Sequence, residues 1–348
     1  MGETGGDTMK RTVARSFRSI CFSSLLLGLF GVVFGAATVV TAADGDGGYA
    51  ASYLQIPLGA RPSGMGGAYI GVADDPAGVY YNPAGVTMLE KPVVGISYRV
   101  LGLGRRLMYA SAMSPIQGNA ILGGHWLHAG TEGVPARDAD GDLLGHDLGE
   151  SHNQLGFVFS KRFEKVFSLG ATFSYVDVKL AEMSTNSVGI DIGIILHLDQ
   201  FFDRERRMKL PVGEPRLGIV VRQLAKKFSW NSEKYELAHS TSPLGADQTD
   251  NVPFEIGAGL SGKILKDKLL LDVDVINSEK VGTDLRFGGE YAASPESRIR
   301  LGYGLEQLAF GAGYEFGFGK QRLRIDYAFS TNRAGADSEH IFSIDFRL

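Results

Sequence analysis

Apolar and polar residues alternate over most of the chain from about residue 93. In the last such run Phe342, Ile344 and Phe346 fall on one face, and Ser343 and Asp345 fall on the other. Successive side chains of a strand point to opposite faces, so these runs predict β-strands with one apolar and one polar face. The runs lie at about 93–101, 106–114, 119–129, 152–162, 165–178, 184–198, 214–224, 252–263, 267–277, 283–293, 297–305, 307–318, 320–331 and 338–348.

This pattern predicts an all-β fold, a transmembrane antiparallel β-barrel of about 14 strands over residues 93–348. Most runs are close to the roughly 9–11 residues that cross a bilayer as a tilted strand. The two longest connections, about 130–151 and 225–251, both follow odd-numbered strands and would lie outside the cell. The long, basic connection at 199–213 breaks that rule and would be a periplasmic projection. A soluble β-sandwich also alternates, but its polar faces would not be so rich in glycine and opposite charges.

The first 42 residues have the composition of a secretory signal peptide. Lys10, Arg11, Arg15 and Arg18 precede an apolar run from about residue 20 to 40, and small residues close the run at Ala42. A basic segment, an apolar segment and a small-residue cleavage site are typical of such signals. We therefore expect cleavage after residue 42 and location in the outer membrane of a Gram-negative-type cell. Translation could begin at Met1 or Met9, and an uncleaved membrane helix is the alternative.

Composition and charge exclude several classes of protein. Glycine accounts for 47 of the 348 residues, about twice the usual share. The formal net charge of -4 argues against a nucleic-acid partner. The single cysteine, Cys21, lies inside the predicted signal peptide, so disulfides and thiol catalysis are not expected. No nucleophile motif is present, and we predict that the protein is not an enzyme.

The polar faces of the predicted strands would line the lumen and carry many charges. Buried charges are stable only when they are partnered, and neighbouring strands can place opposite charges side by side. We therefore expect a filled, cross-linked lumen and not an open pore. The expected charge network consists of Arg286, Arg298, Arg300, Arg322, Arg324, Asp326, Asp345 and Arg347.

Residues 43–92 do not alternate and form a different kind of segment. Asp75 followed by Pro76 suits the start of a helix, and Asn82 followed by Pro83 is a second start or turn signal. Short helical turns broken by glycines, directly before a barrel, predict an N-terminal plug folded into the lumen. Its candidate motif residues are Asp74, Asp75, Pro76, Asn82, Pro83, Ala84 and Gly85.

The same residues resemble a known family. The run from Gly64 through Asp74-Asp75-Pro76 to Asn82-Pro83-Ala84-Gly85 is similar to the N-terminal hatch of FadL-type outer-membrane proteins, in particular their PorV/PorQ branch. Residues 325–328 and 340–346 resemble the end of that branch. The resemblance implies a fourteen-stranded barrel plugged by its N-terminal segment. It also implies that Asn82, Pro83 and Ala84 pack against the barrel wall, near a lateral opening in the fatty-acid transporters.

The resemblance implies two functions. In the PorV branch the barrel is an outer-membrane partner of the type IX secretion system and receives exported cargo, which is the preferred reading. In the FadL branch it is a channel for hydrophobic small molecules such as fatty acids. A structural outer-membrane protein is a further alternative. The expected partners are outer-membrane lipids together with secreted cargo or translocon components, or with a hydrophobic ligand.

One loop carries a weak metal signal. Asp138, Asp140 and Asp142 stand at alternate positions, where carboxylates can converge on a calcium ion. The spacing of glycine and of the last carboxylate does not fit an EF-hand. A solvated external loop is therefore the main expectation, and no other cofactor is expected.

Overall fold

The structure is a computed structural model, and it describes residues 49–102, 104–137, 140–181, 183–200, 212–231, 247–331 and 338–348. The chain divides into two compact units, Met1–Ala42 and Ala43–Leu348. The first unit, with the predicted signal peptide, lies outside the described residues.

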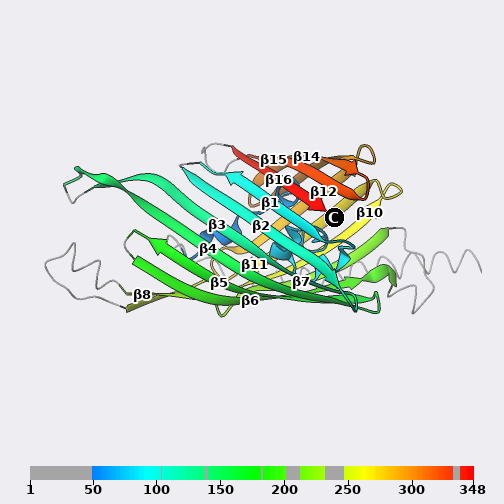
Figure 1. The fold of residues 1–348 in the computed structure, drawn as a ribbon, viewed down its shortest axis with the longest axis horizontal. Coiled ribbons are helices and arrows are strands. Elements are labelled where there is room, and N and C mark those ends of the chain that lie inside the picture. The colour runs from blue at the N-terminus through cyan, green and yellow to red at the C-terminus, as the bar shows by residue number, and fades with distance from the viewer. Residues whose placement is uncertain are drawn as a thin grey trace, which may run out of the picture. The chain divides into compact units, whose positions relative to one another are not determined.

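Fourteen antiparallel strands close into a barrel, as the alternation predicted, because the first barrel strand pairs with the last (Figure 1). Val94 lies opposite Phe346, so the wall has no free edge at this seam. The barrel strands are β1 (Val93–Val100), β2 (Arg105–Ile116), β3 (Ala120–Arg137), β4 (Leu143–Phe163), β5 (Phe167–Leu180), β6 (Met183–His197), β7 (Gly213–Leu224), β10 (Glu255–Ile264), β11 (Leu269–Ser278), β12 (Gly282–Ala292), β13 (Ser297–Gly304), β14 (Gln307–Phe318), β15 (Gln321–Ser330) and β16 (Glu339–Arg347).

The two faces of the wall differ as the sequence predicts. Large apolar side chains such as Ile299, Phe310 and Ile344 are exposed on the outside, while Arg300 and Asp326 are buried inside. An apolar outer surface on a closed barrel is stable in lipid, because every backbone polar group of the wall is already bonded. The described helices are all short, and none of them could cross a bilayer.

Two of the predicted long connections contain strands. β3 and β4 continue well past their neighbours as a two-stranded arm, with bulges between Thr131 and Val134 and between Pro135 and Arg137 (Figure 1). β8 (Lys227–Asn231) and β9 (Asp247–Asn251) form a second hairpin between β7 and β10. The arm and the second hairpin lie at the same end of the barrel, which we call the hairpin end. We call the opposite end of the barrel the C-terminal end. Of the basic connection at 199–213, residues 201–211 lie outside the described residues.

Residues 49–92, here the plug, form a compact segment of short helices inside the barrel. Its helices are η1 (Ser52–Gln55), α2 (Ala60–Gly64), α3 (Gly78–Tyr81) and η2 (Gly85–Met88). Nearly every residue from Pro57 to Val86 is buried. Single helices of four or five residues are not stable alone, so contact with the wall must hold this segment in place.

Candidate functional site

The plug is seated directly on glycines of the barrel wall. A Cβ atom added at Gly302 would lie 2.0 Å from the carbonyl carbon of Met65, and one added at Gly193 would lie 2.0 Å from Oδ1 of Asn82. A Cβ atom added at Gly218 would lie 2.3 Å from the carbonyl oxygen of Ile70. Glycine lets another backbone approach a strand this closely. The glycine surplus seen in the sequence therefore serves in part to seat the plug.

Side chains of the wall also bond the backbone of the plug. The Asp274 carboxylate accepts the backbone N–H groups of Tyr69 and Ile70, at 2.7 and 2.9 Å. Ser261 donates to the carbonyl of Gly71 at 2.9 Å, and Ser343 accepts the N–H of Ala60 at 2.7 Å. Buried backbone groups outside helices and sheets need such partners. The wall thus replaces the hydrogen bonds that the irregular plug cannot make within itself.

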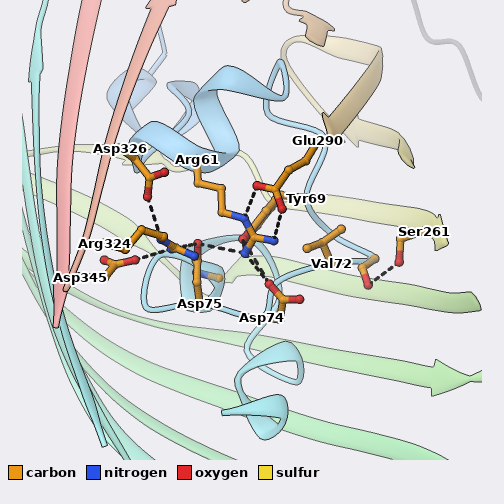
Figure 2. Close-up of polar contacts among 12 residues, drawn as sticks. Arg61, Tyr69, Val72, Asp74, Asp75, Ser261, Glu290, Arg324, Asp326 and Asp345 are labelled. Carbon is orange, nitrogen blue, oxygen red and sulfur yellow. Dashed lines mark hydrogen bonds and ion pairs between the residues drawn. The ribbon is translucent and has the colours of Figure 1, made fainter. Parts of the chain in front are cut away.

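A buried ionic cluster joins the plug to β12, β13, β15 and β16 of the wall, and Figure 2 shows its part around Arg61 and Arg324. We call it the plug network: Arg61, Asp74 and Asp75 of the plug with Glu290, Arg300, Arg324, Asp326 and Asp345 of the wall. Arg61 contacts Asp74 at 2.5 Å and Glu290 at 2.8 Å. Arg324 contacts Asp75 at 2.9 Å and also pairs with Asp345. Each of its three arginines contacts at least two of its five carboxylates, and Arg61 and Arg324 each pair across the boundary between plug and wall.

The electrostatics of Asp74 show the effect of this network on the plug. Burial raises the pKa of the carboxyl, but the guanidinium groups of Arg61 and Arg216 outweigh burial and lower the pKa to about 2, from an ordinary value of 3.8. Ionised Asp74 therefore stabilises the seated plug above about pH 4. That contribution is lost as the pH falls through about 2.

We expect the plug to become sensitive to pepsin between pH 4 and pH 2, the window set by these two pKa values. Cleavage within residues 58–75 should rise over this range while the barrel strands stay intact, as measured by mass spectrometry of the fragments. Asp74→Asn should remove this titrating group and flatten the pH dependence. An unchanged pH profile in that variant would contradict the assignment.

Asp75 and Pro76 combine a local and a long-range role. The Asp75 carboxylate accepts the N–H of Gly78 at 3.1 Å and so stabilises the turn before α3, but the helix begins at Gly78, with Ala77 as its N-cap, and not at Pro76 as the Asp-Pro signal predicted. The same carboxylate lies 2.9 Å from Arg324. The carbonyl of Pro76 accepts the hydroxyl of Ser111 on β2, at 3.0 Å.

Asn82, Pro83, Ala84 and Gly85 lie against the wall where β5, β6 and β7 meet. The Asn82 amide donates to the carbonyls of Ile70 and of Ile194 on β6, both at 3.2 Å, and its Oδ1 accepts the N–H of Ala84 at 3.1 Å. Ser160 donates to the carbonyl of Pro83 at 2.5 Å. Gly85 faces Ala73, which a Cβ atom would approach to 2.3 Å.

The predicted lumen charges separate into three groups. Arg300, Arg324, Asp326 and Asp345 belong to the plug network. Arg286 pairs with Asp284 at 2.6 Å, apart from that network. Arg298, Arg322 and Arg347 lie outside it as well and line the cavity at the C-terminal end. The eight predicted residues therefore do not form one network within the wall. Residues of the plug provide some of the oppositely charged partners.

Three residues that join the plug to the wall, Arg61, Asp274 and Glu290, are not among the predicted site residues. Arg61 contacts more members of the network than any other plug residue described, and Glu290 and Asp274 receive plug groups from the wall. Glu290 and Asp274 appear in the sequence as ordinary polar-face residues. Arg61 stands in a glycine-rich run without periodicity, so only its charge among apolar neighbours could have marked it.

The candidate calcium loop lies at the tip of the β3–β4 arm. Asp138 lies outside the described residues, and Asp140 and Asp142 are exposed. Among the residues that the structure describes, no group of three or more His, Cys, Asp or Glu side chains could hold a metal ion.

A cavity of about 290 Å³ lies between the plug and the hairpin end. Its lining is rich in aromatic and aliphatic side chains, and the ring of Tyr53 lies 4.7 Å from that of His152. Below it, Leu107, Leu127 and Val178 point inward and pack on Leu54 and Leu58 of the plug. The lumen is thus richer in apolar side chains on this side than the C-terminal strands predicted, although Arg105, Glu150 and Asp250 also line the cavity.

A second cavity, of about 740 Å³, opens at the C-terminal end, with Arg61 and Arg300 of the plug network among the residues that line it. The expectation of a filled lumen therefore holds only for the middle of the barrel. The plug separates an apolar chamber from a charged one.

No protein-family model and no curated protein matches the chain. Solved structures do match in fold. The toluene transporter TbuX of Ralstonia pickettii is 13% identical, with a TM-score of 0.60 over 83% of this chain and 98% of its own. The toluene transporter TodX of Pseudomonas putida is 12% identical, with a TM-score of 0.56 over 83% and 96%. A FadL homologue of Pseudomonas aeruginosa is 12% identical, with a TM-score of 0.54 over 84% and 98%. The chain therefore has the fold of the FadL-type outer-membrane channels.

Proposed function

We propose that the protein is an outer-membrane channel for hydrophobic small molecules. The observation that carries this proposal is the chamber at the hairpin end, which is closed below by the plug and lined largely by aromatic and aliphatic groups. Small-molecule sites are typically concave and mostly apolar, with a few polar groups that orient the ligand. Arg105, Glu150, His152 and Asp250 would supply those polar groups here.

The similar structures support the same proposal. Two of them are named as toluene transporters, and a third, CymD, is named as a monoaromatic hydrocarbon channel and is 13% identical, with a TM-score of 0.56. Small aromatic hydrocarbons are the ligand class that these names and the aromatic lining suggest together. The uptake function, an alternative at the level of sequence, thus becomes the main proposal.

A channel for uptake has a defined orientation in the outer membrane and must be exported to it. We infer that the hairpin end faces outward, because outer-membrane barrels carry their longer connections outside and short turns inside. The plug motif would then separate an external chamber from the periplasm. Residues 1–42 would act as the cleaved signal peptide, 43–92 as the plug and 93–348 as the barrel.

The PorV/PorQ resemblance remains a proposal that rests on short sequence motifs. The comparisons give no support to a role in type IX secretion or to secreted cargo as partners. They favour a small hydrophobic ligand.

Filling the chamber should abolish uptake. Ala129 lines it from β3, so Ala129→Phe places a ring in the space where a ligand would bind. We expect the initial rate of uptake of radiolabelled toluene by Gram-negative cells expressing the variant to fall about tenfold or more.

The matched control is Ala112→Phe, because Ala112 lies exposed on the outer face of β2. It should keep the wild-type rate at equal protein level in the outer membrane. Equal rates for both variants and the wild type would refute the chamber as the uptake site.

A further inference from the structure

The cavity at the C-terminal end is positively charged, although the whole chain is acidic. Eleven lysine and arginine side chains line it against seven aspartate and glutamate side chains, and three further carboxylates, Asp75, Asp326 and Asp345, pair with Arg300 and Arg324 without lining it themselves. The whole chain has a formal charge of -4, from 35 basic and 39 acidic residues. A concave, water-filled site with excess charge of one sign concentrates counter-ions of the other sign. Because the plug network already pairs Arg61, Arg300 and Arg324, the excess that favours anions lies on Arg298, Arg322, Arg347 and the lysines of the cavity.

Two arginines in this cavity face one another without enough negative charge between them. Arg322 on β15 and Arg347 on β16 are directly paired in the strand register. In the described part of the chain, the carboxylate within 4 Å of either arginine is that of Glu315, at 3.9 and 3.7 Å. Like charges at directly opposite positions destabilise a sheet. A bound anion would relieve that repulsion, and the exposure of Arg322, 52% of its side chain, leaves it accessible.

Arg298 adds a third guanidinium to the same cavity. It donates to the backbone carbonyls of Ser294 and Pro295, at 2.7 and 3.1 Å. Among the described residues, no carboxylate lies within 4 Å of it. Arg298, Arg322 and Arg347 stand on β13, β15 and β16 and line one cavity. Guanidinium groups bind carboxylate and phosphate oxygens with two parallel hydrogen bonds.

We propose that this cavity binds a small polyanion, a molecule with two or more carboxylate or phosphate groups. Its volume, about 740 Å³, lies in the range of small-molecule sites. The anion would bridge Arg322 and Arg347 and take its remaining contacts from Arg298 and the lysines of the rim. The site is distinct from the apolar chamber, because the plug separates the two, and it does not depend on the uptake function.

The test is calorimetric titration of the full chain in neutral detergent, with citrate and with pyrophosphate as separate probes at low salt. We expect saturable binding of at least one probe, weakened by added salt because the contacts are ionic. Arg322→Gln combined with Arg347→Gln should lower the affinity about tenfold or more. Citrate alone would indicate a polycarboxylate, and pyrophosphate alone a phosphate ligand.

A second variant distinguishes loss of the site from loss of the fold. Glu315→Gln removes the carboxylate that competes for both arginines, so it should raise the affinity about threefold. Damage to the barrel would weaken binding in both variants. Arg106→Gln is the matched control, because Arg106 pairs with Glu132 at the opposite end, and it should leave the affinity unchanged. Absence of saturable binding of either probe, or weaker binding in Glu315→Gln, would overturn the proposal.

Discussion

Arg61→Met should release the plug from the barrel. Arg61 is buried and contacts Asp74, Asp75 and Glu290, so its loss leaves three carboxylates without their shared cation. Removing one partner of a buried ion pair typically costs about 3–5 kcal/mol, since the remaining charge stays in a poorly solvated site. The population of the plug-released state should therefore rise about a hundredfold or more. Methionine keeps most of the side-chain volume, which limits the change to the charge.

The measurement is ion conductance in planar bilayers. The variant should show open-channel events far more often than the wild type. Arg106→Gln serves as the control, because it breaks an exposed arginine–carboxylate pair at the hairpin end, where such pairs contribute about 1 kcal/mol at most. If the Arg61→Met channel opened as rarely as the wild-type channel, the plug network would not be what retains the plug.

Gly302→Ala should prevent the plug from seating at all. The added Cβ atom would lie 2.0 Å from the carbonyl carbon of Met65 and 2.1 Å from the nitrogen of Gly66. Both are backbone atoms, which cannot move aside as the end of a flexible side chain can. Overpacking costs about 1–3 kcal/mol where neighbours can shift, and more where they cannot. We expect faster hydrogen exchange in residues 58–72 together with raised conductance.

Gly289→Ala provides a matched control. Gly289 lies on the neighbouring strand β12, and a Cβ atom there would meet its nearest neighbour, Leu271, at 3.5 Å, an ordinary contact. This variant should exchange like the wild type, because a glycine-to-alanine change in a strand is otherwise tolerated. Equal exchange in both variants would show that the plug does not require Gly302.

The two variants disturb the plug in different ways, which separates charge from shape. Arg61→Met leaves the seat intact and removes ionic attraction, so high salt should reduce the difference from the wild type only slightly, as the network is buried. Gly302→Ala leaves the charges intact and fills the space that the backbone of Met65 and Gly66 occupies when the plug is seated. Release in both variants would mean that the plug needs its charges and its seat together.

Local pattern was a reliable guide to the wall and a partial guide to the site. The alternation around Ile325 and Ile344 places these side chains outside and Asp326 and Asp345 inside, because a strand has a period of two residues whatever its neighbours are. The alternation alone would place apolar side chains outside, but Leu107 and Leu127 are apolar and face inward. Their direction depends on the plug, which offers apolar partners on that side.

The plug shows most clearly which contacts local sequence patterns cannot predict. Asp75 and Pro76 predict a helix start because capping is a local property, and the structure has a turn there that leads into a helix from Gly78. No local property indicates that Asp75 also meets Arg324, which is 249 residues away. Long-range ion pairs depend on which strands become neighbours and on their register.

The amino-acid sequence alone thus determined the fourteen-stranded wall, its lipid-facing surface and the presence of a separate N-terminal plug. Each of these follows from periodicity or from turn chemistry within a few residues. The tertiary structure decided which charges meet, which glycines seat the plug, and that the lumen is divided into an apolar and a basic chamber. These features arise only when the barrel closes, because closure brings residues distant in sequence to contact distance inside one shared space.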